Sequence, residues 1–488
     1  MIEQVDIKES LSLEDYLAIP YLRRNIRDLE LEAQTLVPHL KGRTTWMVNS
    51  TAKGGGVAEM MPKLVCLMRL LGVDINWAVI NTDKMPFFDL TKSLHNMIHG
   101  VDKGEISSVQ KEVFEQVNRE NAVGLEKLMK NGDILAVHDP QPIALNHFIR
   151  KNLDIKSIWR CHIGLDSQNK ATKTAWDFLK PYAEEYDMAI FTAPEYIPPY
   201  LAGKSSIITP ALDPLSHKNR DLIPHKLTGI LCNSGMIQEH NPVVTPPFEN
   251  KAMRLQPDGS FAIATTPDDT GLLYRPIVTQ ISRWDRLKGF KPLMDAFVLL
   301  KKNIKKKVTD ERHLRRLELV RLIMAGPDPA SIQDDPEGKE VLKELCDTYV
   351  NLEPAIQKDV ILLALPMQSQ KENALMVNAL QRCSTVVVQN SIQEGFGLTC
   401  TEPMLKGRAV LVSNACGLRQ QIRDNIDGKM ISDATNTEEI ANALDSMLAD
   451  PKKRETWALN AQRRAIEEFL IFTQAKKWLR TLSSLVAS

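Results

Sequence analysis

Short apolar runs rich in β-branched residues alternate with longer amphipathic stretches along most of this 488-residue chain. Among the clearest runs are TTWMVNS (44–50), DILAVHD (133–139), RPIVTQISRWD (275–285) and RAVLVSN (408–414). Strands that alternate with helices in this way indicate parallel sheets joined by crossover helices. Because a chain of this length exceeds one ordinary hydrophobic core, we expect more than one domain.

The alternation weakens between about Asp213 and Tyr274, where Pro, Asn, Asp and Gly are frequent. A break of this kind between two alternating blocks indicates a domain junction that contains an insertion. We therefore predict an α/β protein with two Rossmann-like, doubly wound domains that face a central cleft. The predicted ranges are 1–217 for the N-terminal domain, 218–470 for the C-terminal domain and 233–273 for an irregular insertion.

Charge and cysteine usage argue against several functional classes. The 61 Lys and Arg residues balance the 61 Asp and Glu residues, so the chain lacks the net basic charge typical of nucleic-acid binding. The densest basic run, 301–316, fits a solvated helix and turn. The seven cysteines are scattered without CxxC or metal-ligand spacing, which indicates reduced thiols. With no signal-like N-terminus and no apolar run that could span a bilayer, we expect a cytoplasmic protein.

Polar clusters follow several of the predicted strands. They are NSTAKGGG (49–56), HDPQP (138–142), RCHIGLD (160–166), SRWDRLKG (282–289) and QNSIQEGFG (389–397). Ligands of open α/β sheets bind beyond the carboxyl ends of the strands. Two facing sheets would bring these clusters to one cleft, which favours an enzyme that joins two substrates between its domains.

The stretch EGFGLTCTE places Glu394 and Glu402 on either side of a Gly-Phe-Gly turn. Gly395 and Gly397 let the chain turn without a Cβ clash, and a helix is expected at about 398–406. Two carboxylates beside a bound diphosphate would repel it, so they are expected to accept hydrogen bonds from neutral hydroxyls of a sugar or a ribose. The alternative is a chance pair of glutamates.

Arg283 and Lys288 follow a predicted strand and could both hold a diphosphate, although two ordinary surface cations are an equal alternative. Gly54, Gly55 and Gly56 form a turn at a helix start, where amides can bind an anion, or a tight packing turn. Their spacing is neither the dinucleotide fingerprint nor the P-loop, which disfavours a nicotinamide cofactor. The chain contains no Asp-x-Asp, so no metal clamp for a diphosphate is evident.

These residues resemble a known family. The two glutamates with their glycines and the upstream cations resemble the E-x7-E region of family-four retaining glycosyltransferases, which have the GT-B fold. NSTAKGGGVAEMM, FFDLTKSLHN, HDPQP and WRCHIGLD are together similar to the subgroup of trehalose glycosyltransferring synthases and trehalose phosphorylases. The similarity covers roughly 43–218 and 275–470. One departure is Gly164, which stands where the subgroup has an acid; another is the segment 233–273, which has no recognised counterpart.

The resemblance implies a role for each matching residue. The residues implied in catalysis are Glu394, His162, Arg283 and Lys288. Glu394 would bind the donor sugar, and the cations would hold the diphosphate. The residues implied in donor binding, besides Arg283 and Lys288, are Gly54, Gly55, Gly56, Gly395, Phe396, Gly397, Leu398, Thr399 and, at the ribose, Glu402. The residues implied in acceptor binding are Lys92, His138, Asp139, Arg160 and Asp166; spacing alone makes Lys92 an ordinary exposed residue.

The implied reaction is a retaining transfer of a hexosyl group, most simply glucosyl, from a nucleoside diphosphate sugar to a sugar or small polyol, with trehalose as a candidate product. No cofactor or metal is expected. The expected partners are the donor and a small sugar, without nucleic acid or membrane, and a homodimer is compatible with the sequence. A trehalose-type phosphorylase that uses phosphate or sugar 1-phosphate is one alternative, and a non-catalytic sugar-nucleotide-binding protein is another.

The last stretch, 469–488, has the periodicity of an amphipathic helix. In GT-B enzymes the terminal helix often crosses back to the first domain, so 471–488 is a candidate for packing there. The side chains expected at such a contact are Trp478, Leu479, Leu482 and Leu485. A helix that caps its own domain is the alternative.

Overall fold

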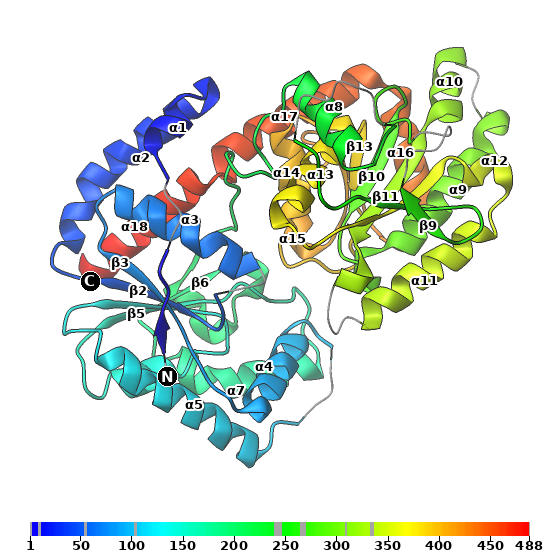
Figure 1. The fold of residues 1–488 in the computed structure, drawn as a ribbon. Coiled ribbons are helices and arrows are strands. Elements are labelled where there is room, and N and C mark those ends of the chain that lie inside the picture. The colour runs from blue at the N-terminus through cyan, green and yellow to red at the C-terminus, as the bar shows by residue number, and fades with distance from the viewer. Residues whose placement is uncertain are drawn as a thin grey trace. The chain divides into compact units, whose positions relative to one another are not determined.

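The computed structural model describes residues 2–7, 11–52, 56–101, 105–238, 246–263, 270–307, 310–331 and 336–487. The chain divides into two compact units (Figure 1). The first contains Met1–Ala211 and Phe469–Ser488, and the second contains Leu212–Glu468. The division therefore lies six residues before the expected boundary at 217.

The first unit is built on a seven-stranded sheet in the order β1-β3-β2-β4-β5-β6-β7. Its strands are β1 (Glu3–Gln4), β2 (Thr45–Asn49), β3 (Ile75–Val79), β4 (Ile134–His138), β5 (Lys156–Arg160), β6 (Met188–Phe191) and β7 (Ser205–Ile207). Neighbouring strands are parallel except β1, which pairs antiparallel with β3. Every residue of β2 and β4 is buried, which explains why both runs are apolar without alternation.

Helices cover both faces of this sheet, with α2, α3 and α18 on one side and α4, α5 and α7 on the other (Figure 1). The helices are α1 (Leu13–Leu17), α2 (Arg23–Leu36), α3 (Gly56–Leu70), α4 (Met85–Ile98), α5 (Ser108–Glu126), α6 (Leu145–Ile149), α7 (Lys170–Ala183) and α18 (Ile471–Ala487). Capping boxes at Ser107 and Asn169 begin α5 and α7. The local sequence thus defines where these helices start.

The terminal helix α18 packs against α2 within the first unit (Figure 1). The rings of Phe472 and Tyr16 meet edge to face with their centroids 5.0 Å apart. Arg480 forms an ion pair with Glu32 on α2. The four apolar side chains expected at this contact are buried, namely Trp478, Leu479, Leu482 and Leu485. The end of the chain is therefore part of the first unit.

The second unit is built on an eight-stranded sheet in the order β15-β14-β13-β10-β11-β12-β8-β9. Its strands are β8 (Met253–Leu255), β9 (Phe261–Ile263), β10 (Ile277–Ile281), β11 (Arg321–Pro327), β12 (Val360–Leu365), β13 (Val386–Gln389), β14 (Ala409–Ser413) and β15 (Lys429–Ile431). The strands from β10 to β15 pair in parallel. Val278 and Leu322 belong to one buried apolar cluster, and Ile277 and Ile323 to another, so alternate residues fill two cores.

Ten helices of the described chain accompany this second sheet. They are α8 (Pro224–Asn233), α9 (Phe290–Lys307), α10 (Glu311–Leu319), α11 (Pro336–Val350), α12 (Pro354–Gln357), α13 (Gln370–Cys383), α14 (Leu398–Leu405), α15 (Cys416–Arg419), α16 (Thr437–Ala449) and α17 (Pro451–Glu468). The helix expected at 398–406 is α14. It follows β13 through the Gly-Phe-Gly turn.

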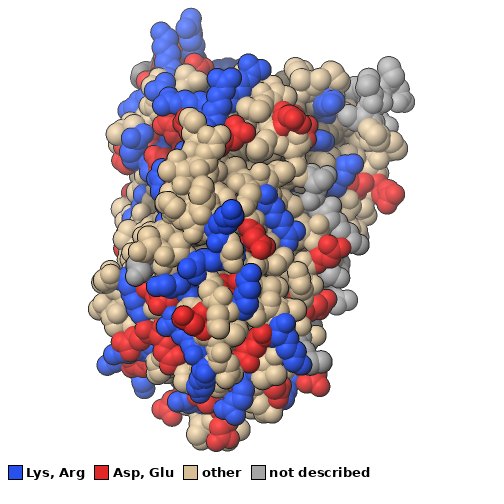
Figure 2. All heavy atoms as spheres, turned by 90° about the vertical axis from the view of Figure 1, so that its left-hand side faces the viewer, with Lys and Arg blue, Asp and Glu red and all other residues tan. Residues whose placement is uncertain are grey.

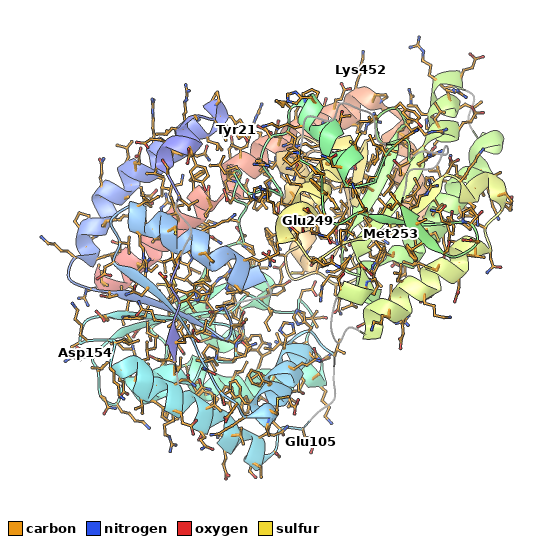
Figure 3. The ribbon with its side chains drawn as sticks, viewed as in Figure 1. Tyr21, Glu105, Asp154, Glu249, Met253 and Lys452 are labelled. Atoms are coloured by element: carbon orange, nitrogen blue, oxygen red, sulfur yellow. The ribbon has the colours of Figure 1, made fainter. Side chains whose placement is uncertain are left out.

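The segment 233–273 is more regular than expected, because its described part contains the hairpin of β8 and β9. These strands extend the sheet antiparallel beyond β12, and Gly259, with φ of 87°, lies in their turn. Met253 begins β8, and the backbone of Glu249 just before it (Figure 3) donates to Oε1 of Glu372 at 2.9 Å. Strands of three residues are too short to give a period-2 signal, so the sequence did not predict them.

Surface charges are mixed. On the face drawn in Figure 2, Lys and Arg side chains are interspersed with Asp and Glu. In the basic run 301–316, Lys301 pairs with Asp359 at 2.9 Å and Lys302 with Glu353 at 3.2 Å, so these cations have local partners. None of the described helices combines the length and apolar composition that crossing a bilayer needs. All seven cysteines are free thiols.

Candidate active site

The loop after β13 fixes the first glutamate of the E-x7-E stretch. Oε2 of Glu394 accepts a hydrogen bond from Nζ of Lys288 at 2.8 Å. The Ser391 hydroxyl at 2.9 Å and the Gln389 amide at 3.2 Å donate to the same oxygen. The Glu394 and Lys288 side chains are only 12% and 14% exposed. Three donors on one oxygen hold this carboxylate in a single orientation.

The predicted pair of cations is separated in the structure. Lys288 reaches Glu394 because the turn at Gly289 packs tightly on the loop after β13: a Cβ at Gly289 would come within 2.1 Å of the Asn390 carbonyl oxygen. Arg283, by contrast, is 72% exposed, and its guanidinium lies 3.6 Å from Asp285. Only Lys288 is therefore held beside Glu394.

Gly397 is required where the turn meets α14. Its φ is 85°, a left-handed conformation that side chains with a Cβ rarely adopt. A Cβ there would also come within 2.8 Å of Cγ of Glu394 and 2.9 Å of Cδ2 of Leu418. The same glycine thus shapes the turn and leaves room for the glutamate.

We expect Gly397→Ala to lower the free energy of unfolding by about 1–3 kcal/mol and to reduce activity, because the strained backbone and the new methyl group would displace Glu394. Gly395→Ala is the matched control, since a Cβ at Gly395 meets no heavy atom within 4 Å. Urea denaturation and a turnover assay of both variants test this. Equal stability of the two variants would contradict it.

The backbone after Gly397 forms the first turn of α14. Leu398 and Thr399 begin the helix, and the Thr399 hydroxyl donates to Oε1 of Gln389 at 2.9 Å. The first amides of a helix lack acceptors within it and suit an anion. Phe396 is 5% exposed, and its carbonyl accepts a hydrogen bond from the Gln421 amide, so this residue supports the turn from inside.

The second glutamate is buried within α14. Glu402 has a side chain 5% exposed, and its Oε2 accepts a hydrogen bond from Nε2 of Gln381 at 2.9 Å. Nζ of Lys218, a side chain 37% exposed, lies 3.7 Å from its Oε1. Oε2 of Glu402 is therefore held from inside the unit, whereas Oε1 faces the partly exposed ammonium of Lys218.

Behind Glu402 lies a residue that the sequence analysis missed. Lys406 is buried, and its ammonium donates to Oε1 of Gln381 at 2.7 Å and to Oδ1 of Asn219 at 3.1 Å. Burial lowers the pKa of Lys406 to about 7, although the nearby Glu402 carboxylate acts in the opposite direction. The only sequence signal was a lysine four residues after Glu402, which is usually an ordinary surface pair.

In the first unit, two predicted polar clusters meet at the carboxyl ends of β4 and β5. Nδ1 of His138 lies 3.0 Å from Nε2 of His162, and the backbone N–H of His162 donates to Oδ1 of Asp139 at 2.8 Å. Burial lowers the pKa of His138 to about 3, with the Arg160 guanidinium as a second cause. Burial also raises the pKa of Asp139 to about 6. The two histidines and the aspartate therefore form one compact group.

The other described residues predicted for this unit are either exposed or buried within the sheet. Arg160 is 1% exposed and donates to the Ile208 carbonyl at 2.5 Å, so it links strands from inside the sheet. Lys92 on α4 and Asp166 after β5 are exposed. Gly56 is the first residue of α3, whereas Gly54 and Gly55 lie outside the described residues.

Gly164 has a structural reason for departing from the subgroup pattern. A Cβ at this position would lie 2.2 Å from Cγ of Tyr196. The ring of Tyr196 thus occupies the space that a side chain at 164 would need. Among the described residues, no group of three His, Cys, Asp or Glu side chains is arranged to hold a metal ion.

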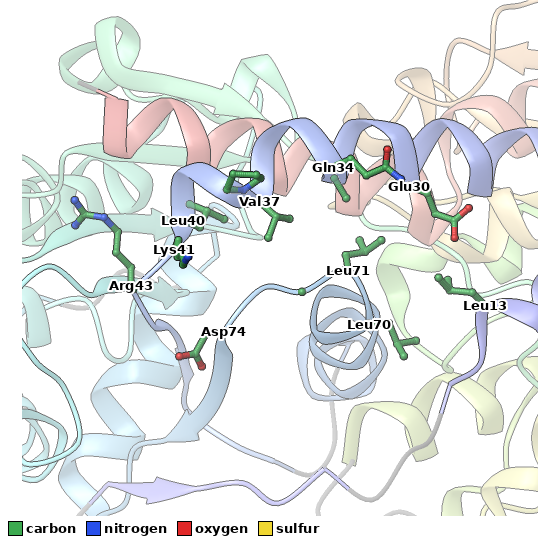
Figure 4. A pocket seen from close by; sticks show the side chains of 14 residues that line it. Leu13, Glu30, Gln34, Val37, Leu40, Lys41, Arg43, Leu70, Leu71 and Asp74 are labelled. Carbon is green, nitrogen blue, oxygen red and sulfur yellow. The ribbon is translucent and has the colours of Figure 1, made fainter.

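A cavity of about 680 Å³ in the first unit is lined by residues other than those of the histidine pair (Figure 4). Its lining includes Arg43 and Asp74, which precede β2 and β3, together with Gln34 of α2 and Leu70 of α3. It is therefore at the amino ends of the parallel strands, whereas the histidine pair is at the carboxyl ends. This cavity is not part of the candidate active site.

Comparison with known proteins identifies the family. Residues 47–198 match the model of the trehalose synthase N-terminal domain, and residues 271–464 match that of glycosyl transferases group 1. A trehalose synthase from Pyrococcus horikoshii is 32% identical, over 97% of this chain and 96% of the relative. This chain belongs to the trehalose synthase family. It is thus an enzyme of the glycosyltransferase class, related to trehalose metabolism.

Two further proteins are similar to this member of the trehalose synthase family. A trehalose phosphorylase from Pleurotus pulmonarius is 23% identical over 88% of this chain and 56% of the relative. A UDP-forming α,α-trehalose-phosphate synthase from Burkholderia xenovorans, solved in complex with glucose-6-phosphate, superposes with a TM-score of 0.62. It is 13% identical and covers 90% of this chain and 100% of that one. The two parallel-sheet units are those of the GT-B fold, as the sequence predicted.

Proposed function

We propose that this protein is a retaining glucosyltransferase that moves glucose from a nucleoside diphosphate glucose to a sugar hydroxyl and forms trehalose. The main observation is the second unit's arrangement of Glu394, Lys288 and the start of α14. A cation and helix amides suit a diphosphate, and carboxylates suit sugar hydroxyls. The donor class is supported by the UDP-forming synthase that shares the fold, and the product by the 32% identical trehalose synthase.

The donor's diphosphate is proposed to bind Lys288 and the amides of Leu398 and Thr399. When the diphosphate binds, the Lys288 ammonium would contact the diphosphate and its ion pair with Glu394 would weaken. Glu394 would keep its orientation because Ser391 and Gln389 still donate to Oε2. The Glu394 carboxylate could then accept hydrogen bonds from the glucose hydroxyls without having to move.

The ribose is proposed to bind Oε1 of Glu402. Gln381 holds Oε2 from inside the unit, while the Lys218 ammonium at 3.7 Å is too distant for a direct hydrogen bond to Oε1. A ribose hydroxyl can therefore displace Lys218 at little cost. The side chain of Lys218 is partly exposed and can turn to solvent.

In the proposed reaction the bond from the anomeric carbon to the diphosphate oxygen breaks while the acceptor oxygen bonds to the same face of that carbon. The acceptor's proton passes to the leaving phosphate oxygen, so configuration is retained. Lys288 and the helix amides stabilise the negative charge that develops on the leaving group. Glu394 positions the sugar, and we propose that no metal or cofactor takes part.

A direct test is to incubate the enzyme with nucleoside diphosphate glucoses and glucose, with and without EDTA. We expect release of the nucleoside diphosphate and a non-reducing disaccharide with both anomeric protons in the α configuration by NMR. Chelation should leave the rate unchanged. Phosphate-dependent cleavage of trehalose without nucleotide dependence would favour the phosphorylase alternative. Binding of the donor without turnover would favour a non-catalytic protein.

A further inference from the structure

The contact between His138 and His162 is an in-plane hydrogen bond. The two nitrogens lie 3.0 Å apart, the ring planes differ by 18° and the ring centroids are 5.3 Å apart. The centroid separation exceeds the nitrogen separation by about the sum of the two ring radii. The rings therefore meet edge to edge, and the shared proton lies between Nδ1 of His138 and Nε2 of His162.

Both rings are uncharged near neutral pH, so one nitrogen of this pair donates and the other accepts. Burial and the Arg160 guanidinium lower the pKa of His138 to about 3. The same two causes, with His138 as a third, lower the pKa of His162 well below its ordinary range. A neutral imidazole has one N–H and one bare nitrogen, so the direction of this bond fixes both tautomers.

Met47 on β2 determines that direction. Its sulfur lies 3.3 Å from Nε2 of His138, whose ring is fully buried. A thioether accepts hydrogen bonds but has no proton to donate. A proton on Nε2 makes this contact favourable, whereas a bare Nε2 would place its lone pair against a lone pair of the Met47 sulfur. His138 is therefore protonated on Nε2, its Nδ1 accepts, and Nε2–H of His162 donates.

We propose that His138, held by Met47, is a positioning residue that fixes His162 in the Nε2–H tautomer and leaves Nδ1 of His162 as an acceptor for a substrate hydroxyl. The backbone of His162 is held as well, since Asp139 accepts its N–H and the Thr192 hydroxyl donates to its carbonyl at 3.2 Å. The His162 side chain is only partly buried. Its role toward substrate rests on the proposed function, but its tautomer does not.

The tautomer can be measured directly on the full-length protein labelled with ¹⁵N at histidine. Long-range ¹H–¹⁵N spectra distinguish a protonated ring nitrogen from a bare one, and the His162→Gln variant assigns the signals. We expect Nε2 of both His138 and His162 to be protonated and both Nδ1 atoms to be bare. A bare Nε2 on His162, or averaged signals from two tautomers, would overturn the proposal.

Two substitutions at His138 distinguish the effect of losing the hydrogen-bond acceptor from the effect of losing the ring. His138→Asn keeps an acceptor, because its Oδ1 is as many bonds from Cα as Nδ1 is; His138→Phe keeps a ring without an acceptor. We expect kcat to fall about tenfold in His138→Phe but only about threefold or less in His138→Asn, with little change in KM. Thermal unfolding of both variants controls for stability. Equal losses, or a greater loss in His138→Asn, would overturn the positioning role.

The NMR measurement and the trehalose-synthesis assay together distinguish failure of this proposal from failure of the proposed function. If no trehalose forms from any nucleoside diphosphate glucose while His162 still has the Nε2–H tautomer, the proposed reaction fails and the tautomer assignment stands. If trehalose forms but His162 has the other tautomer, only the positioning role of His138 is lost.

Discussion

Glu394→Gln is expected to lower the turnover of glucosyl transfer by about 100- to 1,000-fold, because interactions that strengthen in the transition state are lost with the charge. The amide retains the shape of the side chain but presents an NH₂ group where hydroxyls would donate. Glu394→Ala should abolish transfer. Circular dichroism and thermal unfolding of both variants should show an intact fold, since Glu394 lies in the loop between β13 and α14 and outside the apolar core of the second unit.

Glu340→Gln is the matched control for this prediction. The Glu340 side chain is 69% exposed and lies 3.6 Å from Arg286 on the surface of the second unit. Its turnover should equal that of the wild type. Near-normal turnover of Glu394→Gln, measured at saturating donor and acceptor, would reject the role of Glu394.

Lys406→Met is expected to lower the free energy of unfolding by about 2–4 kcal/mol at pH 7, because it leaves buried acceptors without their donor. These are Oε1 of Gln381, Oδ1 of Asn219 and the Glu402 carbonyl. Methionine fills a similar volume, so cavity formation is small. Lys452→Met on α17 is the control: this lysine is exposed (Figure 3) and its loss should change stability by no more than about 0.5 kcal/mol.

The pH dependence of the Lys406→Met effect has a definite sign. The pKa of Lys406 falls from 10.5 to about 7 on folding, so between these values the unfolded chain binds more protons than the folded one. The contribution of Lys406 to the free energy of unfolding of the wild type therefore rises with pH in this window, by at most about 1.4 kcal/mol per unit. Urea denaturation at pH 7 and pH 9 should show a wider gap to Lys406→Met at pH 9. A constant gap would contradict the shifted pKa.

Much of the fold follows from local pattern. The buried parallel strands have continuous apolar runs such as ILAVH in β4 and AVLVS in β14, and these runs predicted both sheets. The hairpin of β8 and β9 was missed because strands of three residues leave no clear period. It also lies in a stretch rich in turn residues, whose composition predicted irregular structure.

The candidate site was predictable only in part. The sequence placed Lys288 and Glu394 in polar clusters that follow predicted strands. The structure brings the two side chains together because those strands, β10 and β13, pair directly. The contact of Lys288 with Glu394 depends on how the turn at Gly289 packs on Asn390, and this packing is a tertiary property. The same is true of the Met47 sulfur behind His138, since β2 and β4 are joined only by long-range pairing.

The central claim is that the second unit holds the donor through one cation, the start of α14 and two glutamates. The most direct measurement is a crystal structure of the full-length enzyme with a nucleoside diphosphate glucose. We predict the diphosphate on Lys288 and on the amides of Leu398 and Thr399, the glucose hydroxyls on Glu394 and the ribose on Glu402. A donor bound elsewhere, with Glu402 still facing Lys218 and Lys288 still paired only with Glu394, would contradict the claim.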